Sequence, residues 1–157
     1  MSKLEEGQIA PDFEALSLLR GKVNLRELTK DKKYLVLYFY PKDDTMGCTK
    51  EACSFRDYFH NIKELNAEVV GVSLDDIESH KKFAQKYNLP FDLIYDEDGK
   101  ISEKYGVLKS IFGKKFASRV TFIINNEGKI VKIFRKVNAA EHGKEVYEFL
   151  KNLETNK

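Results

Sequence analysis

Tyr38-Phe-Tyr-Pro-Lys-Asp-Asp-Thr-Met-Gly-Cys48-Thr-Lys-Glu-Ala-Cys53 is the stretch around which the chain is organised. An apolar and aromatic run ends at Pro41, a polar turn follows, and a helical pattern then begins with Cys48 in its first turn. The chain contains two cysteines, and both lie in this stretch, five positions apart. We interpret the stretch as a thiol site that the rest of the chain holds in place.

The composition indicates a folded domain with a highly charged surface. The chain has 157 residues, of which 42% are hydrophobic and 33% are charged, and its net charge is +2. This length is typical of one compact domain, so we expect residues 1–157 to form a single domain. Acidic and basic residues are interspersed without a basic stripe, which argues against a nucleic-acid partner.

The sequence also argues against a membrane protein. The first seven residues lack the apolar core of a signal peptide, and no apolar run approaches the ~20 residues that span a bilayer. We therefore expect a soluble, cytoplasmic protein without a membrane partner. Because the cytosol is reducing, a cysteine pair there is more often catalytic or metal-binding than a permanent disulfide.

The order of the periodic segments predicts the fold class. Residues 35–40 form a nearly continuous apolar run, which is typical of a central strand buried on both faces, and proline at position 41 ends it. Further strands are predicted at residues 13–19, 23–25, 68–73, 91–95, 120–124 and 130–134. Helices are predicted from Cys48 onward, with a stripe that runs to Ile62, and at residues 77–87, 101–105 and 140–153.

The alternation of strands and helices in the first half predicts parallel pairing, whereas the last two strands form an antiparallel hairpin through a turn at Gly128. We predict an α/β fold with one mixed β-sheet and helices on both faces. Residues 107–118 are predicted to be a loop. Its aromatic side chains, Phe112 and Phe116, are candidates either for lining a pocket or for ordinary packing.

The position of Cys48 predicts a reactive thiol. A cysteine in the first turn of a helix lies near free backbone N–H groups and the positive end of the helix dipole, and both favour the thiolate. Cys48 also shares an apolar stripe with Ala52 and Phe55, so its side chain is expected to point toward the core.

The spacing of the two cysteines predicts a conformational switch. In an α-helix, Cys53 lies about 140° around the axis from Cys48, and their Cα atoms are about 8 to 9 Å apart. A disulfide requires a Cα separation of roughly 4.4 to 6.8 Å. The two cysteines therefore cannot bond while the helix is intact. We predict a reduced, helical form and, where the two cysteines pair, an oxidised form in which the first one or two turns are unwound.

Several other sites do not fit the sequence. There is no Cys-x-x-Cys pair, which disfavours a thioredoxin-type reductase, and the scattered histidines do not match a zinc spacing. No histidine neighbours Cys48 in sequence, so a Cys–His protease would need a partner that lies close only in space. The isolated glycines do not form a phosphate-binding loop.

In the stretch from Pro41 to Cys53 the chain resembles the peroxiredoxins. The pattern Pro41-x-x-x-Thr45-x-x-Cys48 is similar to the Pro-x-x-x-Thr/Ser-x-x-Cys signature of that family. Cys53, five residues further on, is similar to the subgroup called bacterioferritin comigratory protein, or peroxiredoxin Q. One departure is Met46, where that subgroup usually has proline.

Two further segments resemble landmarks of the family, namely Ala10-Pro-Asp-Phe13 and Arg119-Val-Thr-Phe-Ile123. The resemblance therefore covers nearly the whole chain. It implies a thioredoxin-like fold and a thiol-dependent peroxidase that reduces hydrogen peroxide and organic hydroperoxides. No metal or organic cofactor is implied, and the subgroup includes monomers and weak homodimers.

The resemblance also implies a role for each site residue. Cys48 would be the peroxidatic cysteine that becomes a sulfenic acid, and Cys53 the resolving cysteine that forms an intramolecular disulfide with it. Thioredoxin or a similar dithiol would reduce that disulfide. Thr45 would hydrogen-bond the thiolate and the peroxide, Arg119 would stabilise the thiolate and orient the peroxide, and Pro41 would shield the pocket.

Each of these residues also has an ordinary structural interpretation. A helix cysteine is often a small buried hydrophobe, Thr45 is a good N-cap, and Pro41 is a good strand terminator. Two functional alternatives stay open. One is a thiol redox sensor or adaptor that uses the same switch without turnover, and the other is a thioredoxin-like binding module with inert cysteines.

Overall fold

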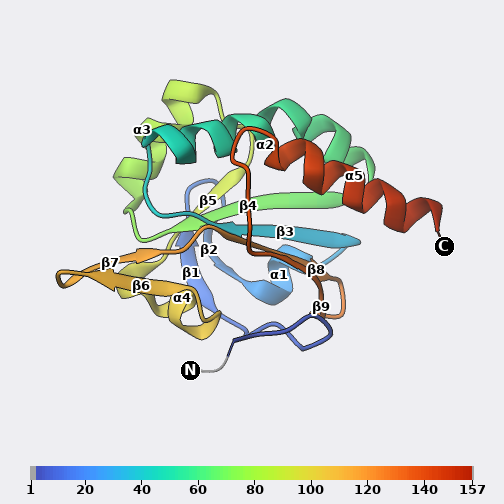
Figure 1. Ribbon diagram of the computed structural model, residues 1–157, viewed down its shortest axis with the longest axis horizontal. Helices are drawn as coiled ribbons and strands as arrows, with labels where there is room; N and C mark the ends of the chain where they lie inside the picture. Colours follow the sequence, from blue (N-terminus) through green and yellow to red (C-terminus); the bar gives the residue numbers. More distant parts are fainter. Residues whose placement is uncertain (1–2, 157) are drawn as a thin grey trace.

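A seven-stranded β-sheet forms the centre of the computed structural model, which describes residues 3–156 (Figure 1). Its strands are β1 (Glu14–Ser17), β2 (Gly21–Asn24), β3 (Tyr34–Phe39), β4 (Ala67–Ser73), β5 (Asp92–Tyr95), β8 (Val120–Asn125) and β9 (Ile130–Phe134). Their order is β2-β1-β5-β4-β3-β8-β9. β3, β4 and β5 are parallel, and the other pairs are antiparallel. The predicted mixed sheet is confirmed.

Helices cover both faces of this sheet, as the sequence predicted. One face carries α2 (Met46–Glu64), α3 (Ile77–Tyr87) and α5 (His142–Thr155), and the opposite face carries α1 (Leu25–Thr29) and α4 (Lys100–Lys104), which follows the 3₁₀ turn η1 (Glu97–Gly99) (Figure 1). No helix within residues 3–156 is both long enough and apolar enough to cross a membrane.

The central strand β3 is buried over its whole length, which explains its continuous apolar sequence. Because side chains alternate along a strand, Leu35, Leu37 and Phe39 pack in one core with α1 and α4. The alternate side chains, Val36 and Tyr38, pack in a second core with α2, α3 and α5.

The structure corrects several predicted boundaries. The first hairpin is shorter than expected, and Leu25 begins α1 where a strand was predicted. This short helix has a signal that the prediction missed, because Asn24 caps it through the amide of Glu27 at 2.8 Å and bonds the Glu27 carboxylate at 3.1 Å. The last helix begins at His142, two residues later than predicted.

Residues 107–118 are not a loop, and this prediction was wrong. They contain an antiparallel hairpin of β6 (Leu108–Ile111) and β7 (Lys114–Ala117), joined by the two residues Phe112 and Gly113. Both turn residues have positive φ, +51° and +78°, as a type I′ turn requires. Such turns usually carry Asn-Gly, so the phenylalanine concealed the turn. Phe112 is fully exposed and therefore neither packs nor lines a pocket.

The pairing of β3 with β8 brings two distant segments together. Phe39, at the end of β3, lies opposite Val120, at the start of β8. The turn that follows β3 and leads to Cys48 therefore lies at the same edge of the sheet as Arg119. This edge is where the residues predicted to form the site meet.

Candidate active site

Cys48 lies in the first turn of α2, as predicted. Thr45 occupies the N-cap position and the helix begins at Met46. The cysteine is 1% exposed and packs in the core between α2 and β3. Because the N–H groups of a first turn have no partner within the helix, they present partial positive charge near the Cys48 sulfur.

Arg119 contacts the sulfur of Cys48. Its Nη2 donates to Sγ over 3.4 Å, which places a permanent cation beside the sulfur. Gly47 permits this approach, since a Cβ atom at that position would lie 3.0 Å from Nη2. The structure thus brings together two predicted site residues that are 71 positions apart in sequence.

Glu51 holds the other arm of the Arg119 guanidinium and was not predicted. Its Oε1 accepts from Nη1 of Arg119 at 2.7 Å, and the Glu51 side chain is fully buried. Glu51 lies three positions after Cys48, so both lie on the same face of α2. The arginine is therefore oriented by a carboxylate on one arm and presents the second arm to sulfur.

Burial raises the pKa of Glu51 to about 7, although Arg119 acts to lower it. The other carboxylate oxygen, Oε2, is buried without a hydrogen-bond partner in the described structure. A negative charge on the buried Glu51 carboxylate is therefore unfavourable, and its ionisation is expected to lower the free energy of unfolding near neutral pH.

Glu51→Gln is expected to remove a pH dependence of the free energy of unfolding. The folded pKa of about 7 exceeds the ordinary value of 4.5, so this group stabilises the fold at low pH and loses that effect as pH rises through 7. Wild type should lose about 3 kcal/mol relative to the variant between pH 5 and pH 8. Urea unfolding of the reduced proteins measures this.

His142 acts in the opposite direction, because burial lowers its pKa and its contribution is lost as pH falls below 6.5. It is present in both proteins, so it cancels in the difference between wild type and Glu51→Gln. A difference that stays constant from pH 5 to pH 8 would contradict the assignment to Glu51.

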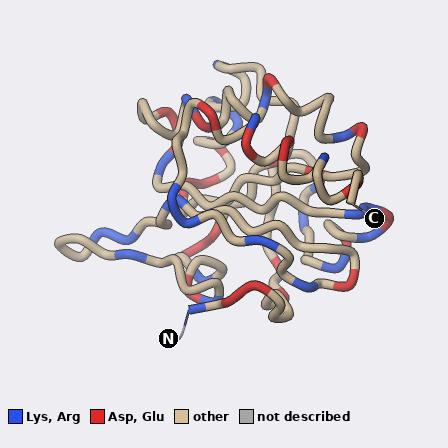
Figure 2. The backbone as a smooth tube through the Cα atoms, turned by 45° about the vertical axis from the view of Figure 1, so that its right-hand side comes forward, with Lys and Arg blue, Asp and Glu red and all other residues tan. Residues whose placement is uncertain are grey.

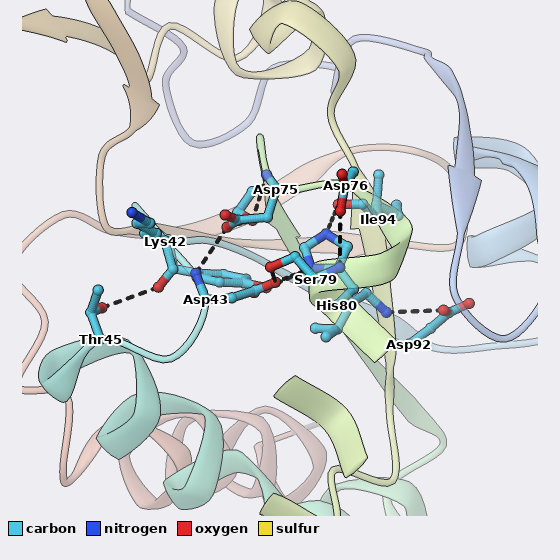
Figure 3. Close-up of polar contacts among 12 residues, drawn as sticks. Lys42, Asp43, Thr45, Asp75, Asp76, Ser79, His80, Asp92 and Ile94 are labelled. Atoms are coloured by element: carbon cyan, nitrogen blue, oxygen red, sulfur yellow. Dashed lines mark hydrogen bonds and ion pairs between the residues drawn. The ribbon is translucent and has the colours of Figure 1, made fainter. Parts of the chain in front are cut away.

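Thr45 and Pro41 lie near the thiol in sequence but do not bond it. The hydroxyl of Thr45 donates to the carbonyl of Lys42 at 3.1 Å and makes no capping bond (Figure 3). Pro41 is half-buried and lies two positions after the end of β3. Within residues 3–156, neither side chain hydrogen-bonds Cys48 in this form, so their predicted roles are not visible here.

A buried polar network fixes the turn between Pro41 and Cys48, and it was also missed from sequence. The Asp43 carboxylate accepts from the hydroxyls of Tyr40 at 2.6 Å and Ser79 at 2.8 Å, and it lies 2.7 Å from Nδ1 of His80 (Figure 3). The other ring nitrogen of His80 donates to the carbonyl of Ile94 at 2.8 Å. The turn is thereby attached to α3 and β5.

This network is a scaffold of hydrogen bonds rather than a metal centre. Its histidine and carboxylates are paired with hydroxyl and backbone groups, such as the amide of Asp43, which donates to Asp75 at 2.8 Å. Within residues 3–156, no group of three or more His, Cys, Asp or Glu side chains is arranged to hold a metal ion.

Cys53 lies further along the same helix and is half-buried. Both cysteines are free thiols, and α2 is continuous through them, which confirms the predicted reduced, helical form. The next residue, Ser54, is where α5 packs against α2. The amide of Gly143 donates to the Ser54 hydroxyl at 2.9 Å, and a side chain at Gly143 would collide with the Ser54 backbone.

Comparisons with known proteins agree with this geometry. The sequence matches the AhpC/TSA family over residues 7–133. It is 45% identical to peroxiredoxin Bcp of Bacillus subtilis, over 96% of this chain and 97% of that protein. It is 43% identical to the chloroplastic peroxiredoxin Q of Populus jackii, over 98% of this chain and 70% of that protein.

Solved structures show the same relationship. The fold is similar to that of peroxidoxin BcpB from Mycobacterium tuberculosis, with a TM-score of 0.88 and 30% identity over 96% of this chain and 98% of that one. It is also similar to the bacterioferritin comigratory protein of Xanthomonas campestris, with a TM-score of 0.80 and 32% identity over 90% and 91% of the two chains. The α/β fold is therefore thioredoxin-like, and the chain belongs to the AhpC/TSA family as a peroxiredoxin of the Bcp and Q group.

Proposed function

We propose that Cys48 is the peroxidatic cysteine of this chain and Cys53 its resolving cysteine. Peroxiredoxins are peroxidases that use a thiol reductant, and the chain is a member of that enzyme class. The observation that carries the assignment is the contact of Arg119 with the buried Cys48 sulfur at 3.4 Å. The similar Xanthomonas campestris protein is described as reducing alkyl peroxides, which supports organic hydroperoxides beside hydrogen peroxide as substrates.

The first step is attack of the Cys48 thiolate on one oxygen of the hydroperoxide. A sulfur–oxygen bond forms, the O–O bond breaks, and the second oxygen leaves as an alkoxide or hydroxide that takes up a proton. Arg119 stabilises the thiolate and the negative charge that develops on the oxygens. In this proposal the Thr45 hydroxyl turns from Lys42 toward the peroxide, and Pro41 keeps water from the thiol.

The second step joins the two cysteines. The Cys53 thiol attacks the sulfur of the Cys48 sulfenic acid, a disulfide forms, and water leaves. A separation of about 8 to 9 Å between the Cα atoms along an intact helix exceeds what a disulfide spans. The start of α2 must therefore unwind in this step.

Oxidation is expected to expose the backbone amides of residues 46–53 to solvent exchange. Their hydrogen bonds depend on the helix that must open, whereas amides in the buried strand β3 keep their protection. Hydrogen exchange with mass-spectrometric readout, on protein treated with one equivalent of hydrogen peroxide, measures the difference. Equal protection of residues 46–53 in the two states would contradict the unwinding.

A dithiol reductant completes the cycle. Thioredoxin or a similar protein attacks the disulfide, passes through a mixed disulfide, and restores both thiols. We propose a cytoplasmic enzyme that acts as a monomer or weak homodimer, because both reacting cysteines lie on one helix and the cycle needs no second copy.

Cys53→Ser is expected to react once with peroxide and then stop. Intact mass after one equivalent of hydrogen peroxide should show a gain of one oxygen in the variant, whereas wild type loses two hydrogens without forming a dimer. With thioredoxin as reductant, steady-state turnover should fall severely. Normal turnover of the variant would remove the resolving role of Cys53, and an unchanged mass of wild type would remove the peroxidase assignment of Cys48.

A further inference from the structure

The β6–β7 hairpin projects from the body of the protein. In two views related by a rotation it extends beyond the sheet and helices as a narrow finger (Figures 1 and 2). Only its base packs, where the Leu108 side chain lies over Gly99 and Ala117 is buried. The outer half therefore contributes little to the core.

The tip of this finger is apolar. Ile111 is 56% exposed and Phe112 is 105% exposed, so no side chain among residues 3–156 covers the Phe112 ring. Phe112 also has a φ of +51°, a conformation that costs energy in a bulky residue and that asparagine or glycine adopts more easily. Neither packing nor turn geometry accounts for a phenylalanine here, which points to an external contact.

Three lysines lie behind the tip, on both faces of the hairpin. Lys109, Lys114 and Lys115 are exposed, and residues 107–118 contain no aspartate or glutamate. Figure 2 shows basic residues on both strands of the finger and no acidic residue along it. Glu103 is the nearest acidic residue in sequence, and Glu97 and Asp98 belong to η1 at the base, where Leu108 lies over Gly99.

We propose that the β6–β7 hairpin docks on the surface of an anionic lipid bilayer. At about 3.4 Å per residue, the lysines lie roughly 3 to 10 Å behind Phe112. An anionic bilayer presents the same order along its normal, with hydrocarbon beneath a layer of negative headgroups, and interfacial segments bury apolar groups to about 5 to 10 Å. Docked this way, Phe112 and Ile111 enter the interface while the lysines meet phosphates.

A lipid surface fits this finger better than a protein or a nucleic acid. The tip is convex and consists of two side chains, whereas a stable protein interface buries about 800 Å² on each partner. Proteins bind single-stranded nucleic acids along basic grooves in which several aromatic rings stack on the bases, whereas the finger offers one exposed aromatic ring. The apolar tip and the lysines behind it match a bilayer, in which hydrocarbon lies beneath a layer of charged headgroups.

The docked hairpin would also bring the thiol site close to the membrane. Arg119 follows β7 after a single residue, so the finger and the guanidinium that contacts Cys48 belong to one continuous segment. This arrangement favours hydroperoxides of membrane lipids as substrates. That consequence depends on the proposed peroxidase function, whereas the docking itself does not.

Vesicle binding of the reduced full-length protein tests the docking. Co-sedimentation uses vesicles of phosphatidylcholine alone and vesicles in which phosphatidylglycerol replaces part of it. Binding is expected only to the anionic vesicles and should weaken at high salt, because each lysine near an anionic surface strengthens binding roughly fivefold. Equal binding to both vesicle types, or none to either, would overturn the proposal.

Phe112→Asn is the sharpest variant. Asparagine suits the positive φ, so the variant should be at least as stable as wild type, while the lipid concentration for half-binding should rise roughly tenfold. Lys114→Glu/Lys115→Glu should abolish binding, and Lys81→Glu/Lys82→Glu on exposed positions of α3 should retain most of it. Equal losses in the two lysine variants, or unchanged binding of Phe112→Asn, would reduce the effect to general charge attraction and overturn the hairpin's role.

Activity separates the docking from the chemistry. Phe112→Asn should reduce hydrogen peroxide at the wild-type rate and lose rate only toward phospholipid hydroperoxide in anionic vesicles. If the wild-type protein bound anionic vesicles but had no peroxidase activity, the proposed function would be wrong and the proposed docking would still hold.

Discussion

Cys48→Ser is expected to abolish peroxidase activity. Serine replaces one atom in a buried position, so the fold should persist, but its hydroxyl does not ionise near neutral pH and does not attack peroxide. Removing the nucleophile should lower turnover roughly a thousandfold or more, to the uncatalysed background. Peroxide consumption coupled to thioredoxin and thioredoxin reductase measures the loss, and circular dichroism checks the fold.

Cys53→Ser is the matched control, because it removes the other thiol from the same helix. It should retain one rapid reaction with peroxide, whereas Cys48→Ser should retain none. If Cys48→Ser kept most of the activity, Cys48 would not be the peroxidatic residue, and the sensor and inert-cysteine alternatives would also fail to explain the turnover.

Arg119→Met is expected to have the second largest effect. Methionine keeps part of the apolar stem but removes the cation that contacts Cys48 at 3.4 Å. Loss of one such electrostatic contact should lower kcat/KM by about 10² to 10³. The variant also leaves Glu51 buried without its ion pair, and breaking a buried pair typically costs about 3 to 5 kcal/mol of stability.

A double variant separates the two effects of Arg119. In Arg119→Met/Glu51→Gln neither position carries a charge, so no unpaired charge is left buried at this site and much of the lost stability should return. Activity should stay low, because the thiolate still lacks its cation. Recovery of activity together with stability would mean that Arg119 acts only by holding the fold. Arg119→Lys keeps the charge but loses the fork that reaches both Glu51 and Cys48, so it should restore activity only in part.

The sequence carried much of the fold because the decisive signals are local. The continuous apolar run before Pro41 identified the buried strand, and the change of period at Cys48 identified the helix. The same stretch placed the thiol in a first turn. The motif and Arg119 could be related only through the resemblance, because their contact depends on the pairing of β3 with β8.

The site residues that the sequence analysis missed interact with partners that are distant in sequence. Glu51 became recognisable only through Arg119, 68 positions away, and Asp43 only through His80, 37 positions away. Residue type alone does not distinguish a buried carboxylate from a solvated one. The β6–β7 hairpin was missed for a local reason, because phenylalanine stands where a type I′ turn normally has asparagine.

The contact between Gly143 and Ser54 has a kinetic consequence. Because α5 holds α2 immediately after Cys53, the segment that opens during the proposed resolution step should be confined to the first two turns of the helix. Helix segments of this size relax in about a microsecond or less, whereas encounter with a protein reductant at cellular concentrations takes far longer. Closure of the helix after reduction should therefore never limit turnover. The enzyme is ready for the next peroxide almost as soon as the reductant departs.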